Sequence, residues 1–417
     1  MNILVLSDNP LNKRLGDGLR AFGLFAPLTR RHRFDLLCFA RPGEAPDADA
    51  STVFRSVTTM AFPRSPARPW HRRLAESLSI RDFRAQSDAM KEEVRRRLSS
   101  GNVDLVLDVA CNMLLNLPEG ALPVPLVVDS IDEALLRDLR DLRGAPWRDK
   151  PRIARQALMY WRYERHTMAR ADANVYVSEV DAATYRRFFP GRPATVVPNG
   201  VDTQYFSPTD AAPEPATLVF EGNMMFGPNV EAARRLALEI LPLVRDAVPA
   251  ARVVLVGRDP APEIRALASD HVMVTGTVDY VRPYLARGTV FACPMRLGSG
   301  IKNKILQAWS MARPVVATPA SLGGLSARDG VNLLVREDNH GFADAVLELM
   351  RHPERATQLG AGGRATVERE YAWPFRAAQF ESVLNEAVEH WRADRSRAPS
   401  AHAGMAVAGG KTSSSRS

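Results

Sequence analysis

The sequence predicts an α/β protein of two Rossmann-like, doubly wound domains that face each other across a cleft. Three observations support this fold class. Short apolar runs of strand length alternate with amphipathic runs of helix length, which is typical of βαβ units and parallel sheets. The alternation stops at a Pro- and Ala-rich stretch and then starts again. The chain has 417 residues, 46% hydrophobic and 24% charged, which suits two soluble globular domains of roughly 150–200 residues each.

The first half of the chain begins with the apolar run NILVLS and ends with ATVVP at 194–198. Its strands are expected at 2–7, 33–39, within 51–61, and at 103–109, 125–129 and 173–177. Its helices are expected at 19–31, 80–99 and 178–189, with one or two more within 134–170. The carboxyl ends of such parallel strands form the edge of the sheet where ligands bind.

The segment 207–216, SPTDAAPEPA, has no periodicity and the composition of a linker. Beyond it, strands are expected at 217–220, 252–256, 272–275, 290–293 and 314–317, with helices at 230–248, 263–267, 304–312 and 341–351. We therefore predict an N-terminal domain at 1–206, a C-terminal domain at 217–394 and a disordered tail at 395–417. Whether the last helix packs back on the N-terminal domain is left open.

Charge and composition narrow the class of protein. The net charge is +8, but arginines are scattered and not interleaved with aromatic residues in one tract, which disfavours nucleic acid as a partner. The widely spaced Cys38, Cys111 and Cys293 are expected to be buried free thiols. The first apolar run ends at Asp8, too early for a signal peptide, and no run approaches the roughly 20 apolar residues that cross a bilayer. We expect a cytoplasmic protein.

The segment Arg296–Pro314, RLGSGIKNKILQAWSMARP, follows an apolar strand and opens a helix. Gly298 and Gly300 let the backbone approach a ligand closely. Unpaired N–H groups and a partial positive charge at the helix start favour an anion, and Lys302 and Lys304 add two ammonium groups there. Lysines at a helix start are unfavourable for the helix alone, and a bound diphosphate would remove that conflict. We predict a phosphate site; an ordinary strand–turn–helix junction with solvated lysines is the alternative.

Two aspartates follow the strand expected at 125–129. Asp129 and Asp132 should lie at the ligand-binding edge of the sheet, where either could orient an acceptor or a sugar. An aspartate before the helical run ALLRDLR is also a favoured N-cap. Both interpretations stay open, and Asp132 is the stronger functional candidate.

The run Gly300-Ile-Lys-Asn-Lys-Ile-Leu-Gln-Ala, with Arg313-Pro-Val-Val-Ala-Thr-Pro after it, resembles the donor-site signature of family-4 glycosyltransferases of the GT-B fold. Its Gly-Ile-x-Asn-Lys form is most similar to sugar transferases associated with bacterial exosortase and exopolysaccharide loci. The resemblance covers about residues 1–390. Its further matches are Asn12-Lys-x-x-Gly16-Asp17-x-x-Arg20, Pro198-Asn-Gly-Val-Asp202, Gly222-Asn223, Val256-Gly257-Arg258, Asp329-Gly330-Val-Asn332 and Glu370-Tyr-Ala-Trp373.

The resemblance implies a glycosyltransferase that moves a sugar from a nucleotide-sugar donor to a glycan or lipid-linked acceptor in cell-surface polysaccharide synthesis, with retained anomeric configuration. The implied donor-binding residues are Gly16, Asn223, Arg258, Gly298, Ser299, Gly300, Ile301, Lys302, Asn303, Lys304 and Gln307. The candidate catalytic residues are Asp17, Asp132 and Gln307. No cofactor besides the donor is expected, and no metal, because Asp47 and Asp49 lie in a loop without a preceding strand.

Some positions depart from the family pattern. The two family glutamates, eight positions apart, correspond to Ser299 and Gln307, and an amide bonds a ribose diol more weakly than a carboxylate does. The glutamate expected near Gly323 is absent, and Ile131 replaces a histidine before Asp132. A nucleotide-sugar epimerase of the same fold and a catalytically weakened nucleotide-binding subunit of a polysaccharide assembly therefore remain alternatives. A dehydrogenase is disfavoured because no Gly-x-Gly-x-x-Gly follows the first strand.

The helices expected at 134–170 are rich in arginine and aromatic residues. Basic amphipathic helices bind anionic membrane surfaces. A peripheral contact with the inner face of the cytoplasmic membrane is therefore a further expectation, with an ordinary solvated helix as its alternative.

Overall fold

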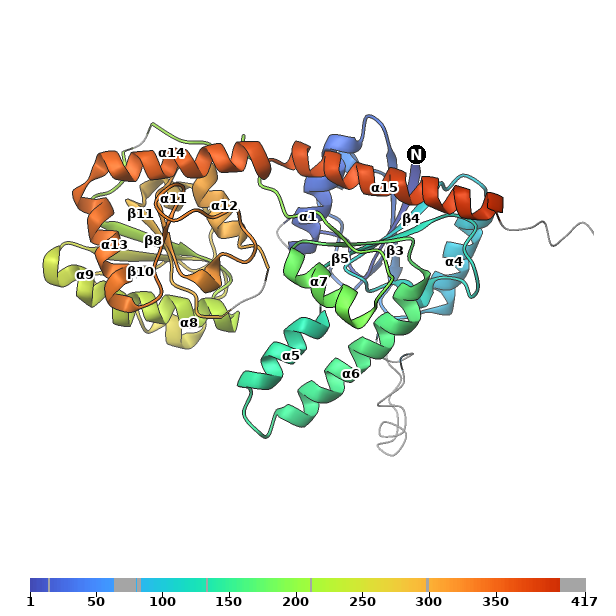
Figure 1. The fold of residues 1–417 in the computed structure, drawn as a ribbon, viewed down its shortest axis with the longest axis horizontal. Helices are drawn as coiled ribbons and strands as arrows, with labels where there is room; N and C mark the ends of the chain where they lie inside the picture. The colour runs from blue at the N-terminus through green and yellow to red at the C-terminus, as the bar shows by residue number, and fades with distance from the viewer. Residues whose placement is uncertain are drawn as a thin grey trace, which may run out of the picture.

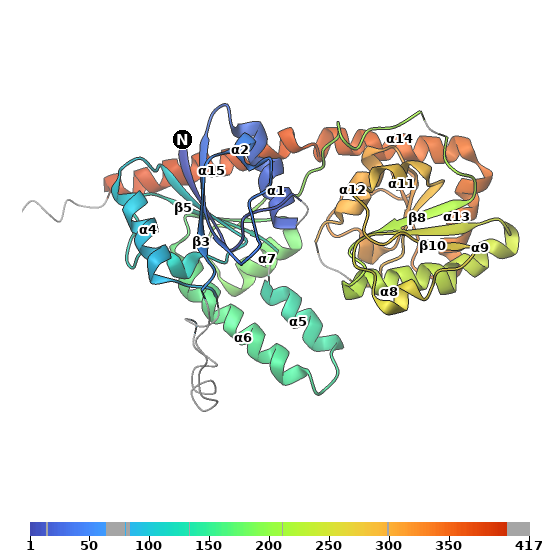
Figure 2. The ribbon, with the colours of Figure 1, turned by 180° about the vertical axis from the view of Figure 1, so that it is seen from behind.

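The computed structural model describes residues 1–13, 16–63, 80, 84–132, 134–210, 212–297 and 300–397. These residues form two lobes, each built on a parallel β-sheet covered by helices (Figures 1 and 2). The predicted fold class, two doubly wound Rossmann-like units, is confirmed.

The N-terminal lobe holds a seven-stranded sheet in the order β3-β2-β1-β4-β5-β6-β7, and every neighbouring pair is parallel. The strands are β1 (Asn2–Ser7), β2 (Arg33–Ala40), β3 (Phe54–Ala61), β4 (Leu105–Val109), β5 (Leu126–Ile131), β6 (Ala173–Tyr176) and β7 (Thr195–Val196). The helices are α1 (Gly16–Phe25), η1 (Ala26–Leu28), α2 (Ala50–Val53), α4 (Asp88–Ser99), η3 (Leu114–Asn116), α5 (Ala134–Gly144), α6 (Lys150–Thr167), η4 (Met168–Arg170) and α7 (Glu179–Phe188).

Alternating side chains of β1 supply the cores on the two faces of this sheet. Ile3 and Val5 pack in one cluster with residues of α1, while Leu4 and Leu6 pack in another with residues of α4 and α7. Because successive strand residues point to opposite faces, a strand that is apolar at every position must be covered on both sides. The continuous apolar run NILVLS is therefore the sequence signature of this central strand.

The C-terminal lobe holds a six-stranded parallel sheet in the order β10-β9-β8-β11-β12-β13. The strands are β8 (Thr217–Glu221), β9 (Arg252–Val256), β10 (Val272–Val274), β11 (Val290–Cys293), β12 (Val315–Ala317) and β13 (Leu334–Val335). The helices are α8 (Gly227–Arg235), α9 (Leu241–Ala247), α10 (Pro262–Arg265), α11 (Arg282–Arg287), α12 (Asn303–Ser310), η6 (Pro319–Ser321), α13 (Asn339–Arg351), α14 (Pro353–Glu370) and α15 (Trp373–Arg397), and a π-helical turn spans Leu236–Ile240.

The last helix, α15, returns to the N-terminal lobe and packs there on α1 (Figure 1). The Trp373 ring lies between Gly23 and Gly200, where an added Cβ would come within 2.2 Å and 2.6 Å of ring atoms. The Val201 N–H donates to the Tyr371 carbonyl at 2.8 Å, which joins the two segments that cross between the lobes. Residues 395–397 belong to α15, and the rest of the expected tail lies outside the described residues.

Several helices differ from their predicted limits. The helix expected at 230–248 consists of α8, the π-helical turn and α9, and Pro242, which has no backbone N–H, stands at the start of α9. The expected helix 19–31 is the shorter α1, and α4 begins only at Asp88. The expected helical region 134–170 is an antiparallel pair, α5 and α6, which projects from the N-terminal lobe (Figure 1). Within the described residues, no helix combines the length and apolar character that a membrane span requires.

Candidate functional site

The carboxyl ends of the strands of both sheets meet between the lobes. Asp132 directly follows β5, and a Cβ added to Gly300, in the loop after β11, would lie 3.0 Å from its Oδ1. Nδ2 of Asn199 donates to Oδ1 of Asn303 at 3.4 Å. We call this region, defined by Asp132, Asn199, Gly300, Lys302 and Asn303, the inter-lobe junction. Ligands of doubly wound sheets bind at such edges.

A close backbone contact shapes the loop before α12. Gly300 has a φ of +66° and Gly323 a φ of +50°, a region in which only glycine is free of strain. A Cβ on Gly323 would lie 1.9 Å from the Gly300 carbonyl oxygen. Gly298 and Ser299 lie outside the described residues. Ile301, predicted at the donor site, is buried in the core of the C-terminal lobe.

Lys304, in the first turn of α12, is buried at the carboxyl edge of the second sheet. Its Nζ donates to Oδ1 of Asn229 at 2.8 Å and lies 4.2 Å from the centre of the Phe220 ring. Burial lowers the pKa of Lys304, while the nearby Cys293 and Glu221 favour the charged form. The alternative of solvated lysines at this helix start is therefore wrong for Lys304.

Lys302 lies at the N-cap of α12, and its Nζ donates to the Gly300 carbonyl at 2.9 Å. Burial lowers its pKa, and Asp132 of the other lobe partly offsets that effect. Asp132 is exposed at the junction, but the surrounding protein displaces enough bulk water to raise its pKa. Asp181 raises that pKa further, whereas Lys302 lowers it. The two lobes are thus coupled electrostatically at this point.

The loops after β8 and β9 pack tightly against one another. A Cβ on Gly257 would lie 1.7 Å from the Gly222 carbonyl oxygen. Oδ1 of Asn223 accepts from the Met225 N–H at 3.0 Å and so closes a turn. The exposed Arg258 is held through its carbonyl, which accepts from the Met224 N–H at 3.1 Å.

Gln307 and Glu221 bring two further polar groups to this edge. Oε1 of Gln307, three residues after Lys304, is buried and accepts no hydrogen bond from the described residues. A buried acceptor without a partner is costly, so this atom is suited to a ligand hydroxyl. Sequence reasoning missed Glu221, whose pKa is raised by burial and lowered by Lys304. The sequence feature that could have identified Glu221 is an acidic residue at the end of an apolar strand.

Gly16 and Asp17 open α1 at the carboxyl edge of the first sheet. A Cβ on Gly16 would meet no atom within 4 Å, so this position borders open space. Oδ2 of Asp17 accepts from Nδ2 of Asn9 at 2.7 Å, and its Oδ1 accepts from the Gly18 N–H at 2.9 Å. The structure thus orients the Asp17 carboxylate through neighbouring residues of its own loop.

Asp129 has a structural role. Arg20 donates to both of its carboxylate oxygens, from Nε to Oδ2 at 2.8 Å and from Nη2 to Oδ1 at 2.9 Å, and both residues are buried. Nη1 of Arg20 also donates to the Val197 carbonyl and to Oδ1 of Asn199. This ion pair joins α1, β5 and the start of the segment that crosses to the second lobe.

Comparison with protein families divides the chain at the same place as the structure does. Residues 21–205 match the model "Glycosyltransferase Family 4", and residues 215–352 match "Glycosyl transferases group 1". Across both halves the chain is similar to glycosyltransferases, and its first half is similar to family 4. The two matched segments fall on the two sheets of this GT-B fold.

Three relatives of this chain illustrate the similarity. A GDP-mannose-dependent alpha-(1-6)-phosphatidylinositol monomannoside mannosyltransferase of Mycobacterium tuberculosis is 30% identical over 51% of this chain and 61% of its own length. The enzyme of Corynebacterium glutamicum that acts on the monoacylated form is 26% identical over 51% and 62%. An alpha-maltose-1-phosphate synthase of Mycolicibacterium smegmatis is 29% identical over 58% and 70%. The chain thus spans about three fifths of the length of the two mannosyltransferases.

Solved structures share the fold at low sequence identity. Sucrose-phosphate synthase from Thermosynechococcus elongatus aligns with a TM-score of 0.67 at 16% identity, over 94% of this chain and all of that chain. HepE of Anabaena, solved in complex with UDP, aligns with a TM-score of 0.63 at 13% identity, over 93% and 100%.

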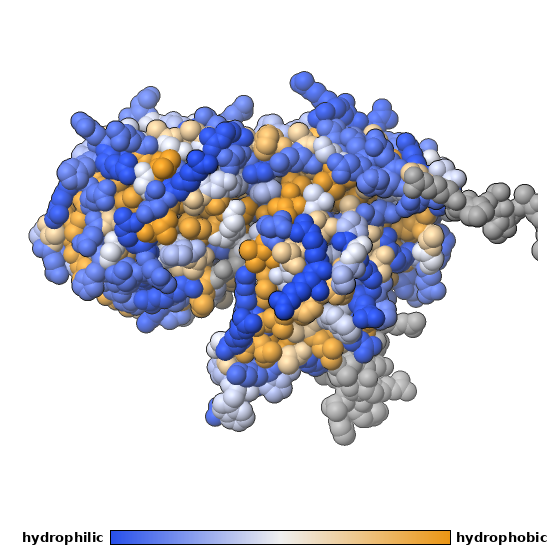
Figure 3. Space-filling view, in the orientation of Figure 1, coloured by the Kyte–Doolittle hydropathy of each residue, from blue (hydrophilic) through white to orange (hydrophobic). Residues whose placement is uncertain are grey.

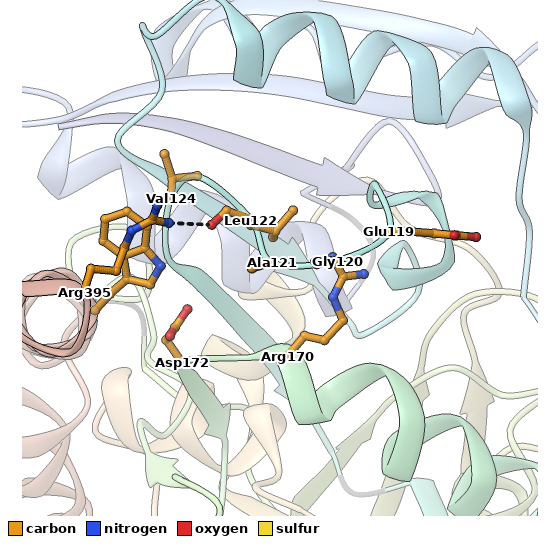
Figure 4. Close-up of a pocket in the computed structure, with 9 residues that line it drawn as sticks. Glu119, Gly120, Ala121, Leu122, Val124, Arg170, Asp172 and Arg395 are labelled. Atoms are coloured by element: carbon orange, nitrogen blue, oxygen red, sulfur yellow. Dashed lines mark hydrogen bonds between the residues drawn. The ribbon is translucent and has the colours of Figure 1, made fainter. Parts of the chain in front are cut away.

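A hollow of about 600 Å³ lies away from the inter-lobe junction, at the amino edge of the first sheet (Figure 4). It is bordered by the loop before β5 and by Trp391 and Arg395 at the end of α15. Arg170 donates to the Gly120 carbonyl at 2.8 Å, and Arg395 donates to the Leu122 carbonyl at 3.4 Å. Both guanidinium groups therefore bind backbone carbonyls at the amino edge of the first sheet.

No cluster of three or more His, Cys, Asp or Glu side chains suited to a metal occurs in the described part of the chain. Asp49 pairs with Lys13 at 2.6 Å, and Oδ2 of Asp47 accepts from the Lys13 N–H at 3.1 Å.

Proposed function

We propose that this protein transfers a sugar from a nucleoside-diphosphate sugar to a glycan or lipid-linked acceptor in bacterial cell-surface polysaccharide synthesis, at the inner face of the cytoplasmic membrane. The observation that carries the proposal is the convergence of Lys302, Lys304 and the start of α12 with Asp132 of the other lobe. Cationic groups and helix N–H groups are suited to a diphosphate.

In the proposed reaction, the bond between the anomeric carbon and the diphosphate oxygen breaks, and a bond to the acceptor hydroxyl oxygen forms. The departing diphosphate gains negative charge, and its oxygen takes up the proton that the acceptor hydroxyl loses. Lys302, Lys304 and the N–H groups that open α12 would stabilise that charge, because they are fixed before the reaction begins. Oε1 of Gln307 would accept from a ribose hydroxyl, and Asp132 would orient the acceptor or the sugar. The proposal includes no metal, and it includes retention at the anomeric carbon.

The donor base has two candidates. The mannosyltransferase relatives are named as GDP-mannose-dependent, whereas HepE was solved with UDP. The former are the nearer in sequence, which favours a GDP-sugar as the first donor to test. The exopolysaccharide role is proposed from the Gly-Ile-x-Asn-Lys sequence at Gly300–Lys304.

The test is turnover of labelled GDP- and UDP-sugars with and without a membrane extract that carries lipid-linked acceptors. The proposed transferase moves label into the lipid fraction and releases nucleoside diphosphate. Lys302→Met should abolish that transfer, while Lys91→Met on α4, which removes the same charge far from the junction, should leave it unchanged. Epimerised donor in the absence of acceptor would favour the epimerase. Nucleotide binding without turnover of any donor would favour a binding subunit.

A further inference from the structure

The pair α5 and α6 forms a helical hairpin that stands out from the N-terminal lobe (Figures 1 and 3). We call residues 134–167 the hairpin. Its two helices are joined by a five-residue turn at 145–149, and Ile153 and Ala157 of α6 are buried. Nε2 of Gln156 donates to Oδ1 of Asp138, and Nη2 of Arg137 to the Tyr160 hydroxyl, both at 3.3 Å. These contacts hold the hairpin together as a unit.

The hairpin carries much of the chain's excess positive charge. It has nine Arg and Lys residues and four Asp and Glu residues, a net charge of +5 within a chain of net +8. Arg143, Lys150 and Arg152, close to the tip, are exposed. Lys150 and Arg152 also occupy the first turn of α6, which contains no acidic residue. Cations at a helix start destabilise the helix, so these charges do not serve the fold.

The tip presents an aromatic side chain to solvent. Trp147 is 76% exposed, the largest exposed fraction among the large hydrophobic residues of the described chain. It follows Pro146 and precedes Arg148, whose guanidinium lies 5.5 Å from the centre of the indole. Tryptophan is enriched where protein meets the headgroup layer of a bilayer, because its ring is apolar and its N–H is polar.

We infer that the hairpin docks the protein on an anionic membrane, with Trp147 in the headgroup layer and the exposed arginines and Lys150 of the tip against lipid phosphates. Charge complementarity indicates the partner, because an anionic leaflet attracts Lys and Arg side chains near its surface. This attraction decays within about a Debye length of the surface. A nucleic acid would need a basic face with stacking aromatics along its length, whereas the hairpin presents a single exposed indole at its end.

The location of the hairpin links docking to the site. Asp132 lies two positions before α5, and the tip lies one helix length beyond it. At 1.5 Å per residue, an upright α5 of 11 residues would hold Asp132 roughly 16 Å above the headgroups. Arg140 of α5 also lowers the pKa of Lys302. Docking would therefore present the junction to the headgroup of a lipid-linked acceptor, and this last step alone rests on the proposed function.

The test is sedimentation of the full-length protein with vesicles of phosphatidylcholine alone or with 30% phosphatidylglycerol. We expect binding only to the anionic vesicles at low salt, and its loss in high salt. R143Q/R152Q should weaken it roughly 10- to 30-fold, and W147A should weaken it about 10-fold. The control R30Q/R351Q removes two exposed charges elsewhere and should bind as the wild type does. Failure of the wild type to bind at low salt, or equal loss in the control, would overturn the inference.

A second readout reports on Trp147 directly. The fluorescence of Trp147 is the difference between the emission of the wild type and that of W147F. Lipids brominated near the headgroup should quench this fluorescence. Absence of quenching would contradict insertion of the tip. Turnover of a detergent-dispersed acceptor should be unchanged in W147A, while turnover in vesicles should fall. Vesicle binding without any turnover would refute the proposed reaction and leave the docking intact.

Discussion

Nζ of Lys304 and Oδ1 of Asn229 are joined by a hydrogen bond of 2.8 Å, which connects the first turns of α12 and α8. These helices follow the neighbouring strands β11 and β8, so two helix N-termini converge on one edge of the sheet. Each N-terminus carries partial positive charge. The buried ammonium thus lies where two helix N-termini meet, and a pKa lowered by burial, as that of Lys304 is, is typical of a functional site.

Lys304→Met should weaken nucleoside-diphosphate binding. A hydrogen bond to a charged group contributes about 1.5–3 kcal/mol, so calorimetry should show a roughly 10- to 150-fold loss. The folded state should also lose about 1–3 kcal/mol, because Oδ1 of Asn229 loses its donor. Asn229→Leu removes the same bond but keeps the ammonium, and it should lose less affinity. Unchanged binding in Lys304→Met would refute the phosphate site.

Asp132→Asn should stabilise the protein at neutral pH while reducing turnover. Because the folded-state pKa of Asp132 is raised, the folded protein holds this proton more tightly than the unfolded chain does. The carboxylate therefore lowers the free energy of unfolding above the raised pKa, and the penalty fades as the pH falls toward about 3.9. Denaturant unfolding at several pH values should show a gain in the variant that shrinks with acidification. A gain independent of pH would contradict the assignment.

Gly323→Ala should disturb the loop before α12, since its Cβ would lie 1.9 Å from the Gly300 carbonyl oxygen and its φ is +50°. We expect backbone strain to lower the free energy of unfolding by about 1–3 kcal/mol. The free energy of nucleotide binding should lose a larger fraction of its wild-type value than the free energy of unfolding does. Gly16→Ala is the matched control for bulk, because its Cβ meets nothing. It should unfold at the wild-type temperature, and any fall in its turnover would report on ligand space beside Gly16. Wild-type affinity in Gly323→Ala would show that the loop does not contact the nucleotide.

Arg20→Met should destabilise the protein by about 3–5 kcal/mol, because it leaves the Asp129 carboxylate buried and unpaired. The double variant R20M/D129L removes both charges and should recover most of that loss. Chemical unfolding of the two variants measures the difference. Equal stabilities would mean that the carboxylate is not the source of the penalty.

Local sequence patterns predicted the strands well and contacts between distant residues poorly. β1 has the predicted limits, 2–7, because a run buried on both faces must be apolar throughout. The segment 296–314 was singled out as a phosphate site because glycines and lysines at a helix start are unusual, and that assignment stays a prediction. Arg20 and Asp129, by contrast, are 109 positions apart, and neither has a local sign of its partner. The interruption between α8 and α9 was missed because the apolar periodicity continues through the π-helical turn at Leu236–Ile240.

The placement of Trp373 between Gly23 and Gly200 affects the order in which the chain becomes complete during synthesis. The ribosome finishes the whole second sheet before it makes the helix that covers α1. The first lobe therefore stays incomplete, with an apolar face of α1 uncovered, until α15 has been made. This holds although domains generally fold in the order in which they are made. Nascent chains stopped at residue 372 should be cut by protease in the first lobe and resist cleavage in the second.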